Sequence, residues 1–177
     1  MCASWFSKKE SSPTPRDYVY ANSAAKFRGV KNLLSLFPNH ILIAWFPGTL
    51  SAFQQFATEQ GIEAEISLAR EVNSFHVTGK TVLFLEHYPL SDKETSLVQS
   101  WNADGIIVLS ALDEPLFVHF AGERLSLLLH KMGLKEDESL QHVLITEAIH
   151  NAQQKLAKKI TVEHSANSME EWFRKNI

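Results

Sequence analysis

The tripeptide Gly79-Lys80-Thr81 suggests chemistry at once, because phosphate-binding loops contain the same three residue types. Such a loop needs a strand before it and a helix after it, so that backbone N–H groups at the helix N-terminus hold the phosphates. Here an apolar strand pattern, residues 82–85, follows the tripeptide, and Ser74 stands where the motif needs glycine. The sequence therefore predicts a turn at Gly79-Lys80 and no phosphate loop.

A second candidate site, Glu86-His87-Tyr88, comes directly after that strand. A carboxylate and an imidazole that are buried together can act as an acid–base pair. Ligands of open α/β sheets bind outside the carboxyl ends of the strands, where Gly48 and Thr49 also lie after an earlier apolar run. Two interpretations stay open: a ligand crevice, or hydrogen-bonded residues that close the strand ends.

Two further sets of residues have the types, but not the full pattern, of a catalytic or metal site. Glu147 and His150 form a single E-x-x-H pair, whereas di-metal carboxylate bundles need two such pairs and two more glutamates. Ser110, Asp113 and His119 lie near one another in sequence, but no base or oxyanion site is evident. Capping of the next helix by Ser110 or Asp113 is the simpler interpretation, and we predict no catalytic residue and no metal site.

The elements that position these residues follow an α/β pattern. Short apolar runs predict strands at residues 41–46, 62–66, 81–89 and 105–110, with helical patterns between them. This alternation predicts right-handed crossovers and a parallel sheet of about four strands in the order 2-1-3-4. The switch point then lies between the first and third of these strands.

Helix ends in the first half carry capping signals. Asn22 or Ser23 is expected to cap the first helix, and Thr49 or Ser51 the second. Gly61 lies where the second helix is expected to end in a left-handed residue.

The length and composition favour a single domain with a helical extension. The 177 residues are 45% hydrophobic and carry a net charge of -3. We expect a flexible N-terminal arm at 1–16, an α/β domain at 17–112, and a helical extension at 113–177 packed on it. The acidic balance disfavours nucleic acid, and no apolar run reaches the ~18 residues of a membrane helix. Without a signal-peptide pattern, the expected location is cytoplasmic.

The C-terminal tail predicts one more helix with an aromatic face. Ser168 and Glu171 have capping-box spacing. Met169, Trp172 and Phe173 fall on one side of this helix. The helix either packs back on the domain or presents Trp172 and Phe173 as an exposed anchor for a partner.

Residues 109–158 resemble SecA, the ATP-driven preprotein translocase motor. The motifs that carry the resemblance are Asp113-Glu114, Leu116, Phe120, Gly122-Glu123-Arg124, Lys131-Met132-Gly133, Glu136-Asp137-Glu138, and residues 148–155, which read AIHNAQQK. The preceding residues, 17–110, resemble the second RecA-like domain of that motor more loosely. The resemblance implies a RecA-like three-layer fold, followed by the start of the motor's helical region.

The sequence departs from the motor where the motor handles ATP. In the family, an arginine-containing Gln-x-x-Gly-Arg-x-Gly-Arg motif follows the strand that matches residues 81–89. This chain has no arginine there, so no side chain plays the arginine-finger role. We likewise expect no first RecA-like domain with its Walker loop, since no phosphate loop is predicted in these residues. We therefore expect no ATP binding, no cofactor and no catalysis.

The resemblance and its departures together suggest an accessory module that docks a protein partner. Candidate partner surfaces are the acidic run Glu136, Asp137 and Glu138, together with Trp172 and Phe173. A basic run, Lys155, Lys158 and Lys159, ends the same helical region and also complements a helix dipole. The alternatives are a small-ligand or enzyme site at the strand-end crevice, or completion of a nucleotide site on another protein.

Overall fold

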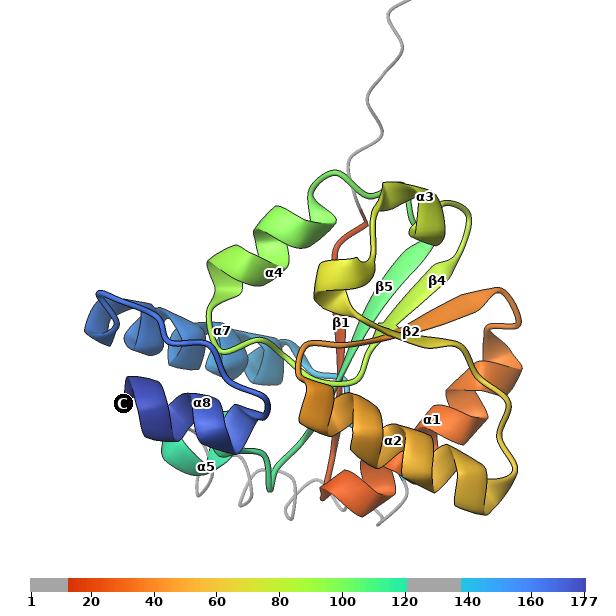
Figure 1. Cartoon of the computed structure of the whole chain (residues 1–177), viewed down its shortest axis with the longest axis horizontal. Coiled ribbons are helices and arrows are strands. Elements are labelled where there is room, and N and C mark those ends of the chain that lie inside the picture. The colour runs from red at the N-terminus through yellow and green to blue at the C-terminus, as the bar shows by residue number, and fades with distance from the viewer. Residues whose placement is uncertain (1–12, 121–137) are drawn as a thin grey trace, which may run out of the picture.

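The computed structural model describes residues 13–120 and 138–177, and a parallel sheet lies at its centre. The sheet has five strands in the order β1-β5-β4-β2-β3, and every pairing is parallel (Figure 1). The strands are β1 (Arg16–Tyr20), β2 (His40–Ala44), β3 (Ile66–Leu68), β4 (Thr81–Phe84) and β5 (Gly105–Ala111).

Four of these strands lie in the order that the sequence predicts, and the fold class is confirmed as α/β. The strand count is corrected from four to five, because β1 pairs with β5 and extends that edge of the sheet. The pattern missed β1 because its first two residues, Arg16 and Asp17, are polar and only three apolar residues follow. The strand begins at Arg16, the last residue of the predicted arm.

Helices cover both faces of the sheet and make the fold three-layered. On one face, α1 (Ser23–Leu36) and α2 (Pro47–Gln60) pack on inward residues such as Leu42 and Leu83. The short η1 (Ala69–Glu71) and α3 (Ser74–Val77), together with α4 (Ser91–Val98), cover the other face. Neighbouring residues of one strand point to opposite faces, and both faces of β2 and β4 are buried.

Of the helix caps predicted in the first half of the chain, two are present and one is not. The Asn22 side chain accepts from the N–H of Ala25 at 2.8 Å, and Gly61 ends α2 with φ 63°. The prediction of Thr49 or Ser51 as the cap of α2 is wrong, because that helix already begins at Pro47. Pro at the first helical position loses no hydrogen bond there, which allows the earlier start.

The C-terminal helices form a separate hydrophobic cluster beside the sheet. The cluster joins α5 (Pro115–Phe120), α7 (Val143–Lys159) and α8 (Met169–Asn176), with Trp172 fully buried at its centre. Val19 of β1 and Phe46 before α2 belong to the same cluster, so it is continuous with the α/β part. From residue 121 to 137, the predicted helical stretch lies outside the described residues.

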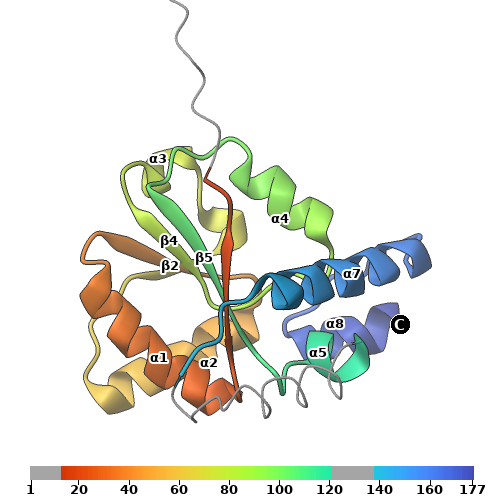
Figure 2. The same cartoon turned by 180° about the vertical axis from the view of Figure 1, so that it is seen from behind.

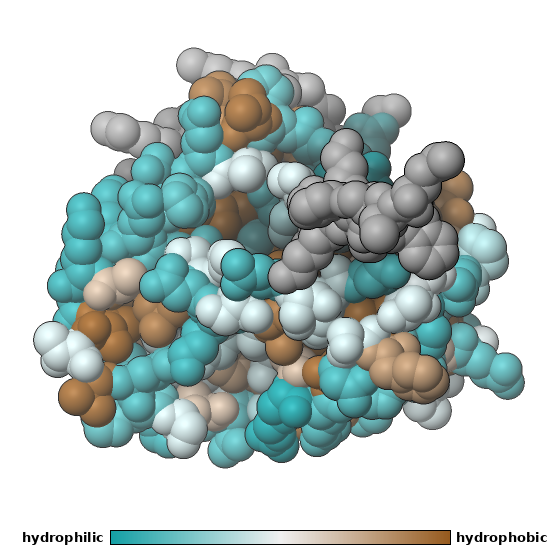
Figure 3. All heavy atoms as spheres, turned by 90° about the horizontal axis from the view of Figure 1, so that it is seen from above, coloured by the Kyte–Doolittle hydropathy of each residue, from teal (hydrophilic) through white to brown (hydrophobic). Residues whose placement is uncertain are grey.

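The β1 edge of the sheet is covered by the segment that leads into α7. Val19 and Leu140 form an antiparallel bridge, with N–H···O distances of 3.1 and 2.8 Å. Figure 2 shows α7 running outward from this point above α5 and α8. From the end where α3 and α4 lie, the described surface is mostly hydrophilic, with scattered apolar patches (Figure 3). Among the described helices, none combines the length and the apolar character needed to cross a bilayer.

Candidate functional site

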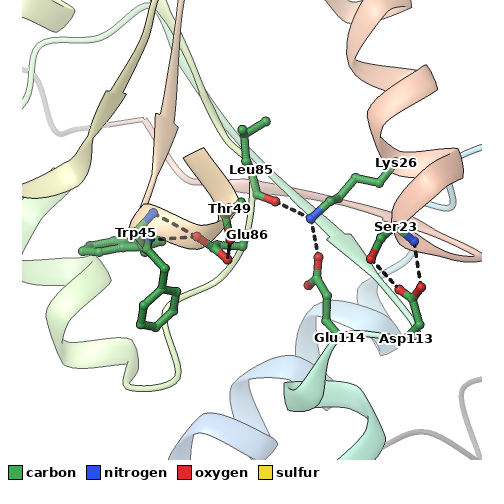
Figure 4. A network of polar contacts seen from close by, with 9 residues as sticks. Ser23, Lys26, Trp45, Thr49, Leu85, Glu86, Asp113 and Glu114 are labelled. Carbon is green, nitrogen blue, oxygen red and sulfur yellow. Dashed lines mark hydrogen bonds and ion pairs between the residues drawn. The ribbon is translucent and has the colours of Figure 1, made fainter. Parts of the chain in front are cut away.

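The carboxyl ends of β2 and β4 lie side by side, and Glu86 bridges them. Its Oε1 accepts hydrogen bonds from the backbone N–H groups of Trp45 and Phe46, both at 3.0 Å. Its Oε2 accepts from Thr49 Oγ1 at 2.5 Å (Figure 4). A carboxylate at a helix N-terminus is favourable because the exposed N–H groups and the dipole attract negative charge. Burial nevertheless raises the pKa of Glu86 to about 7.

Lys26 crosses the space between α1 and the strand ends. Its Nζ donates to the carbonyl oxygen of Leu85 at 2.6 Å and forms an ion pair with Glu114. Both partners of this ion pair are buried. Burial raises the pKa of Glu114, although the charge of Lys26 opposes that rise. A buried pair of this kind holds α1 and the start of α5 in one arrangement, because either charge alone would be costly.

The residue before Glu114 holds the N-terminus of α1. Asp113 accepts from the backbone N–H and the Oγ of Ser23, at 3.0 and 2.8 Å. Asp113 therefore bonds to the first residue of α1, which is distant in sequence, whereas the sequence suggested it as a cap of the helix that follows β5. Figure 4 shows the two acidic residues side by side, each facing a different residue of α1.

His87 points away from Glu86 and lies between two other carboxylates. Its Nδ1 is 2.9 Å from Glu94 Oε1, and its Nε2 is 3.1 Å from Asp17 Oδ1. Burial alone would lower the pKa of His87, but the charges of Glu94 and Asp17 outweigh it and raise the pKa to about 10. Burial would likewise raise the pKa of Asp17, but His87 lowers it. The site thus holds a charged imidazolium bound by two acids.

Tyr88 and Gly48 connect the crevice to the segment before α8. The Tyr88 hydroxyl donates to Glu163, which also accepts from Trp172 Nε1 at 2.8 Å. The N–H of Gly48 donates to the carbonyl of Asn167 at 2.7 Å. A side chain at Gly48 would meet that carbonyl at 3.1 Å. The chain's own C-terminal segment therefore lies against the N-terminus of α2.

Of the five predicted crevice residues, Thr49 and Glu86 are hydrogen-bonded, and Gly48 and Tyr88 lie beside them at the strand ends. His87 instead contacts Asp17 and Glu94, so it does not form the suggested acid–base pair with Glu86. Most of their polar groups bond to one another or to other parts of the chain in the contacts described above. His87 Nε2 has only its ionic contact with Asp17, and the nearby buried atoms Trp45 Nε1 and Glu114 Oε2 have no hydrogen-bond partner among the described residues. The geometry therefore favours the interpretation of closed strand ends over a ligand crevice.

The predicted partner-surface residues have different outcomes. Trp172 and Phe173 are 0% and 4% exposed, so the helix packs back on the domain, as one of the two interpretations predicted, and their choice as partner-surface residues is corrected. Their side chains fill the cluster between α5 and α7, where an apolar helix face is most stable. Glu138 is exposed, whereas Glu136 and Asp137 lie outside the described residues.

The sequence analysis did not predict several residues that contact the strand ends, although the position of Lys26 in its helix could have indicated one of them. Lys26 lies four residues before Val30 and seven before Leu33, on the apolar stripe of α1. A lysine at such a position needs a buried partner. Asp17 and Glu94 gave no comparable signal, because their contact with His87 joins segments far apart in sequence.

The other candidate residues from the sequence lie in positions that a structural role explains. Gly79, with φ 68°, lies in the turn between α3 and β4, as predicted. Ser110 is fully buried in β5, and the His119 ring stacks on Phe173 at 4.8 Å. His150 is exposed and contacts Gln154. Among the residues described, no group of three or more His, Cys, Asp or Glu side chains is placed to hold a metal ion.

Part of the chain is similar in sequence to known proteins. The chain is 50% identical over 46 residues to the protein translocase subunit SecA of Syntrophobacter fumaroxidans. The corresponding values are 44% over 46 residues for SecA of Methylococcus capsulatus and 43% over 49 residues for SecA of Acidithiobacillus ferrooxidans. The chain contains a SecA-related region. No protein-family profile matches the chain.

The similarity covers only a small part of this chain and a small part of each SecA protein. The matches cover 26–28% of this chain and only 5–6% of the length of these SecA proteins. In residues 148–155 of α7, whose sequence resembles SecA, Ile149, Ala152 and Gln153 are buried. Gln153 Nε2 donates to the carbonyl of Tyr88 at 2.8 Å and to Glu94 Oε2 at 2.9 Å. The buried side of this segment, through Gln153, therefore attaches α7 to the strand ends.

Proposed function

We propose that this protein is a catalytically inactive, SecA-related accessory module that binds a protein partner in protein translocation. The observation that carries the proposal is the local SecA similarity. The SecA-like motif recognised in the sequence, residues 148–155, lies in α7, and buried residues of this helix join it to the sheet. A segment fixed in this way presents its outward residues in a defined arrangement. Rigid presentation of a surface favours binding because less conformational entropy is lost.

The strand-end network supports the absence of nucleotide chemistry in this proposal. A triphosphate at this edge would need the free N–H groups at the start of α2. Glu86 already accepts from two N–H groups there, and Gly48 donates to Asn167. An incoming phosphate would have to displace a carboxylate of like charge and a packed segment of the chain. The small-ligand alternative meets the same obstacle.

A thermal-shift experiment tests the nucleotide part of the proposal. ATP and ADP, each with magnesium, are expected to leave the melting temperature of the full chain unchanged, because only ligands that bind the folded state raise it. A magnesium-dependent rise of several degrees, or measurable release of phosphate from ATP, would overturn the assignment as inactive.

An affinity experiment tests the link to translocation. The tagged full chain is incubated with native extract, and bound proteins are identified by mass spectrometry. Translocase subunits are expected to be enriched over a tag-only sample. A matched sample of heat-unfolded protein shows whether capture depends on the fold. Equal recovery with both samples, or no translocase subunit among the enriched proteins, would contradict the proposal.

A further inference from the structure

The outward side of α7 forms a continuous exposed strip that the strand-end network does not use. We call it the outer face of α7, and all of its residues are exposed. It consists of Val143, Leu144, Glu147, His150, Asn151, Gln154, Lys155 and Lys158. From Leu144 to Lys158 the strip is about 21 Å long, at ~1.5 Å per residue.

The two ends of this face differ in chemistry. At the N-terminal end, Val143 and Leu144 are 64% and 50% exposed, so two adjacent large apolar side chains face solvent. At the other end, Lys155 and Lys158 take no part in the ion pairs between described residues. Lys93 and Lys175, by contrast, are each paired with a glutamate. The face therefore offers an apolar end and a positive end with no carboxylate from the described chain.

The helix dipole accounts for only one of these ends. Lysines in the last turn of a helix are favourable because the carbonyl end is partly negative. The dipole does not explain why Val143 and Leu144 are exposed at the first turn, where burial would be favourable. A binding partner accounts for both ends at once.

We propose that the outer face of α7 docks an amphipathic, acidic helix of the partner protein, antiparallel to α7. In that orientation the partner's first turn, where aspartate and glutamate are favoured, lies opposite Lys155 and Lys158. Its apolar residues, about four turns later, lie on Val143 and Leu144. This inference rests on the proposed function and adds the surface and the chemistry of the partner to it.

The middle of the face fits a protein helix better than a polyanion. Glu147 lies between the apolar and basic ends, and Asn151 and Gln154 provide amide groups for hydrogen bonds. A nucleic acid surface would need a dense run of positive charge, whereas this chain has a net charge of -3. The chemistry thus selects a partner with carboxylates at one end only.

Photo-crosslinking from Gln154 tests the surface and the partner chemistry together. A photoreactive amino acid replaces Gln154 in the full chain, and the same amino acid at Lys31, exposed on α1, is the matched control. After irradiation in native extract, mass spectrometry identifies the crosslinked peptide. The expected result is a helical peptide rich in aspartate and glutamate, crosslinked from position 154 and not from position 31. No crosslink above the control, a crosslink to a second copy of this chain, or a peptide without acidic residues would overturn the inference.

Charge reversal on the same face provides the second measurement. The Lys155→Glu/Lys158→Glu variant is expected to reduce the position-154 crosslink at least about tenfold, because like charges at an interface are strongly unfavourable. Lys31→Glu should leave both the crosslink and the melting temperature unchanged. The double variant should melt only slightly below the parent protein, because it loses the favourable interaction of Lys158 with the end of the helix. An undiminished crosslink in the double variant would overturn the inference.

The two proposals fail in different ways in these experiments. If translocase subunits are still captured by the Lys155→Glu/Lys158→Glu variant at the parental level, the proposed surface is wrong and the proposed function stands. If the acidic helix crosslinks as expected but belongs to a protein unconnected with translocation, the surface stands and the proposed function is wrong.

Discussion

The strand ends and the outer face of α7 are both rich in polar residues, but their polar groups are used in opposite ways. At the strand ends, Lys26, Glu86 and His87 are buried, and each contacts groups from other elements. On the outer face of α7, Lys155 and Lys158 are exposed and take no part in the ion pairs between described residues. A cluster of charged residues therefore marks a binding site only if its hydrogen-bonding capacity is still available.

This difference follows from the free energy of desolvation. A buried charge is tolerated only with a partner, so the strand-end residues must satisfy one another before the chain can fold. An exposed charge is solvated and costs little, and a partner can still bind to it. Substitutions at the strand ends should therefore change stability, and substitutions on the outer face should change binding.

The largest effect is expected for Lys26→Met. Removing the ammonium leaves Glu114 buried without its partner and the Leu85 carbonyl without this donor. Loss of one partner of a buried ion pair costs about 3–5 kcal/mol in the free energy of unfolding. Chemical denaturation of the variant measures this loss directly.

Two further variants sharpen the interpretation of Lys26→Met. Lys31→Met, on the exposed side of the same helix, should change the free energy of unfolding by less than about 0.5 kcal/mol. Lys26→Met combined with Glu114→Gln should regain part of the loss, because the unpaired negative charge is gone. If the double variant is as unstable as the sum of both single variants, the ion pair is not the cause.

The second largest effect is a pH dependence from Glu86. Because its pKa is about 7 in the folded protein and its ordinary value is 4.5, the folded state binds the proton more tightly. Stability contributed by protonated Glu86 is fully present below pH 4.5 and is lost as pH rises through 7. The change is roughly 3 kcal/mol, since one pKa unit corresponds to about 1.4 kcal/mol.

Comparison of variants isolates this contribution from the other titrating groups. Glu86→Gln should flatten the fall of the melting temperature between pH 4.5 and 7 relative to the parent protein. Glu59→Gln, at an exposed position of α2, should run parallel to the parent curve. Parallel curves for the parent and Glu86→Gln would show that Glu86 does not titrate in this range.

Periodicity predicted the sheet because most strands are strongly apolar. The strands β2, β4 and β5 are buried on both faces, so they read as continuous apolar runs. The edge strand β1 has only three apolar residues, and its pairing partner lies about 90 residues away in the sequence. Local patterns do not contain such a pairing.

The sequence predicted where the candidate site lies, but not whether its polar groups are free. Strand-end geometry correctly gathered Thr49, Glu86 and Tyr88, since parallel strands end at one edge of the sheet. Whether their polar groups are free depends on residues from elsewhere, such as Gln153 and Glu163, which bond to Tyr88. Those contacts result from tertiary packing, which the sequence spacing of the site residues does not encode.

The smallest effects are expected for two adjacent glutamines of α7. One is buried and the other is exposed, so they test the difference between buried and exposed polar groups within one helix. Gln153→Ala removes the donor to Tyr88 and Glu94, and unsatisfied buried groups cost about 1–3 kcal/mol. Gln154→Ala removes only an exposed contact with His150, and should change stability by less than about 0.5 kcal/mol. Urea denaturation of both variants gives the two values under the same conditions. Equal losses would mean that the inward and outward sides of α7 do not differ in the way that the burial of Gln153 requires.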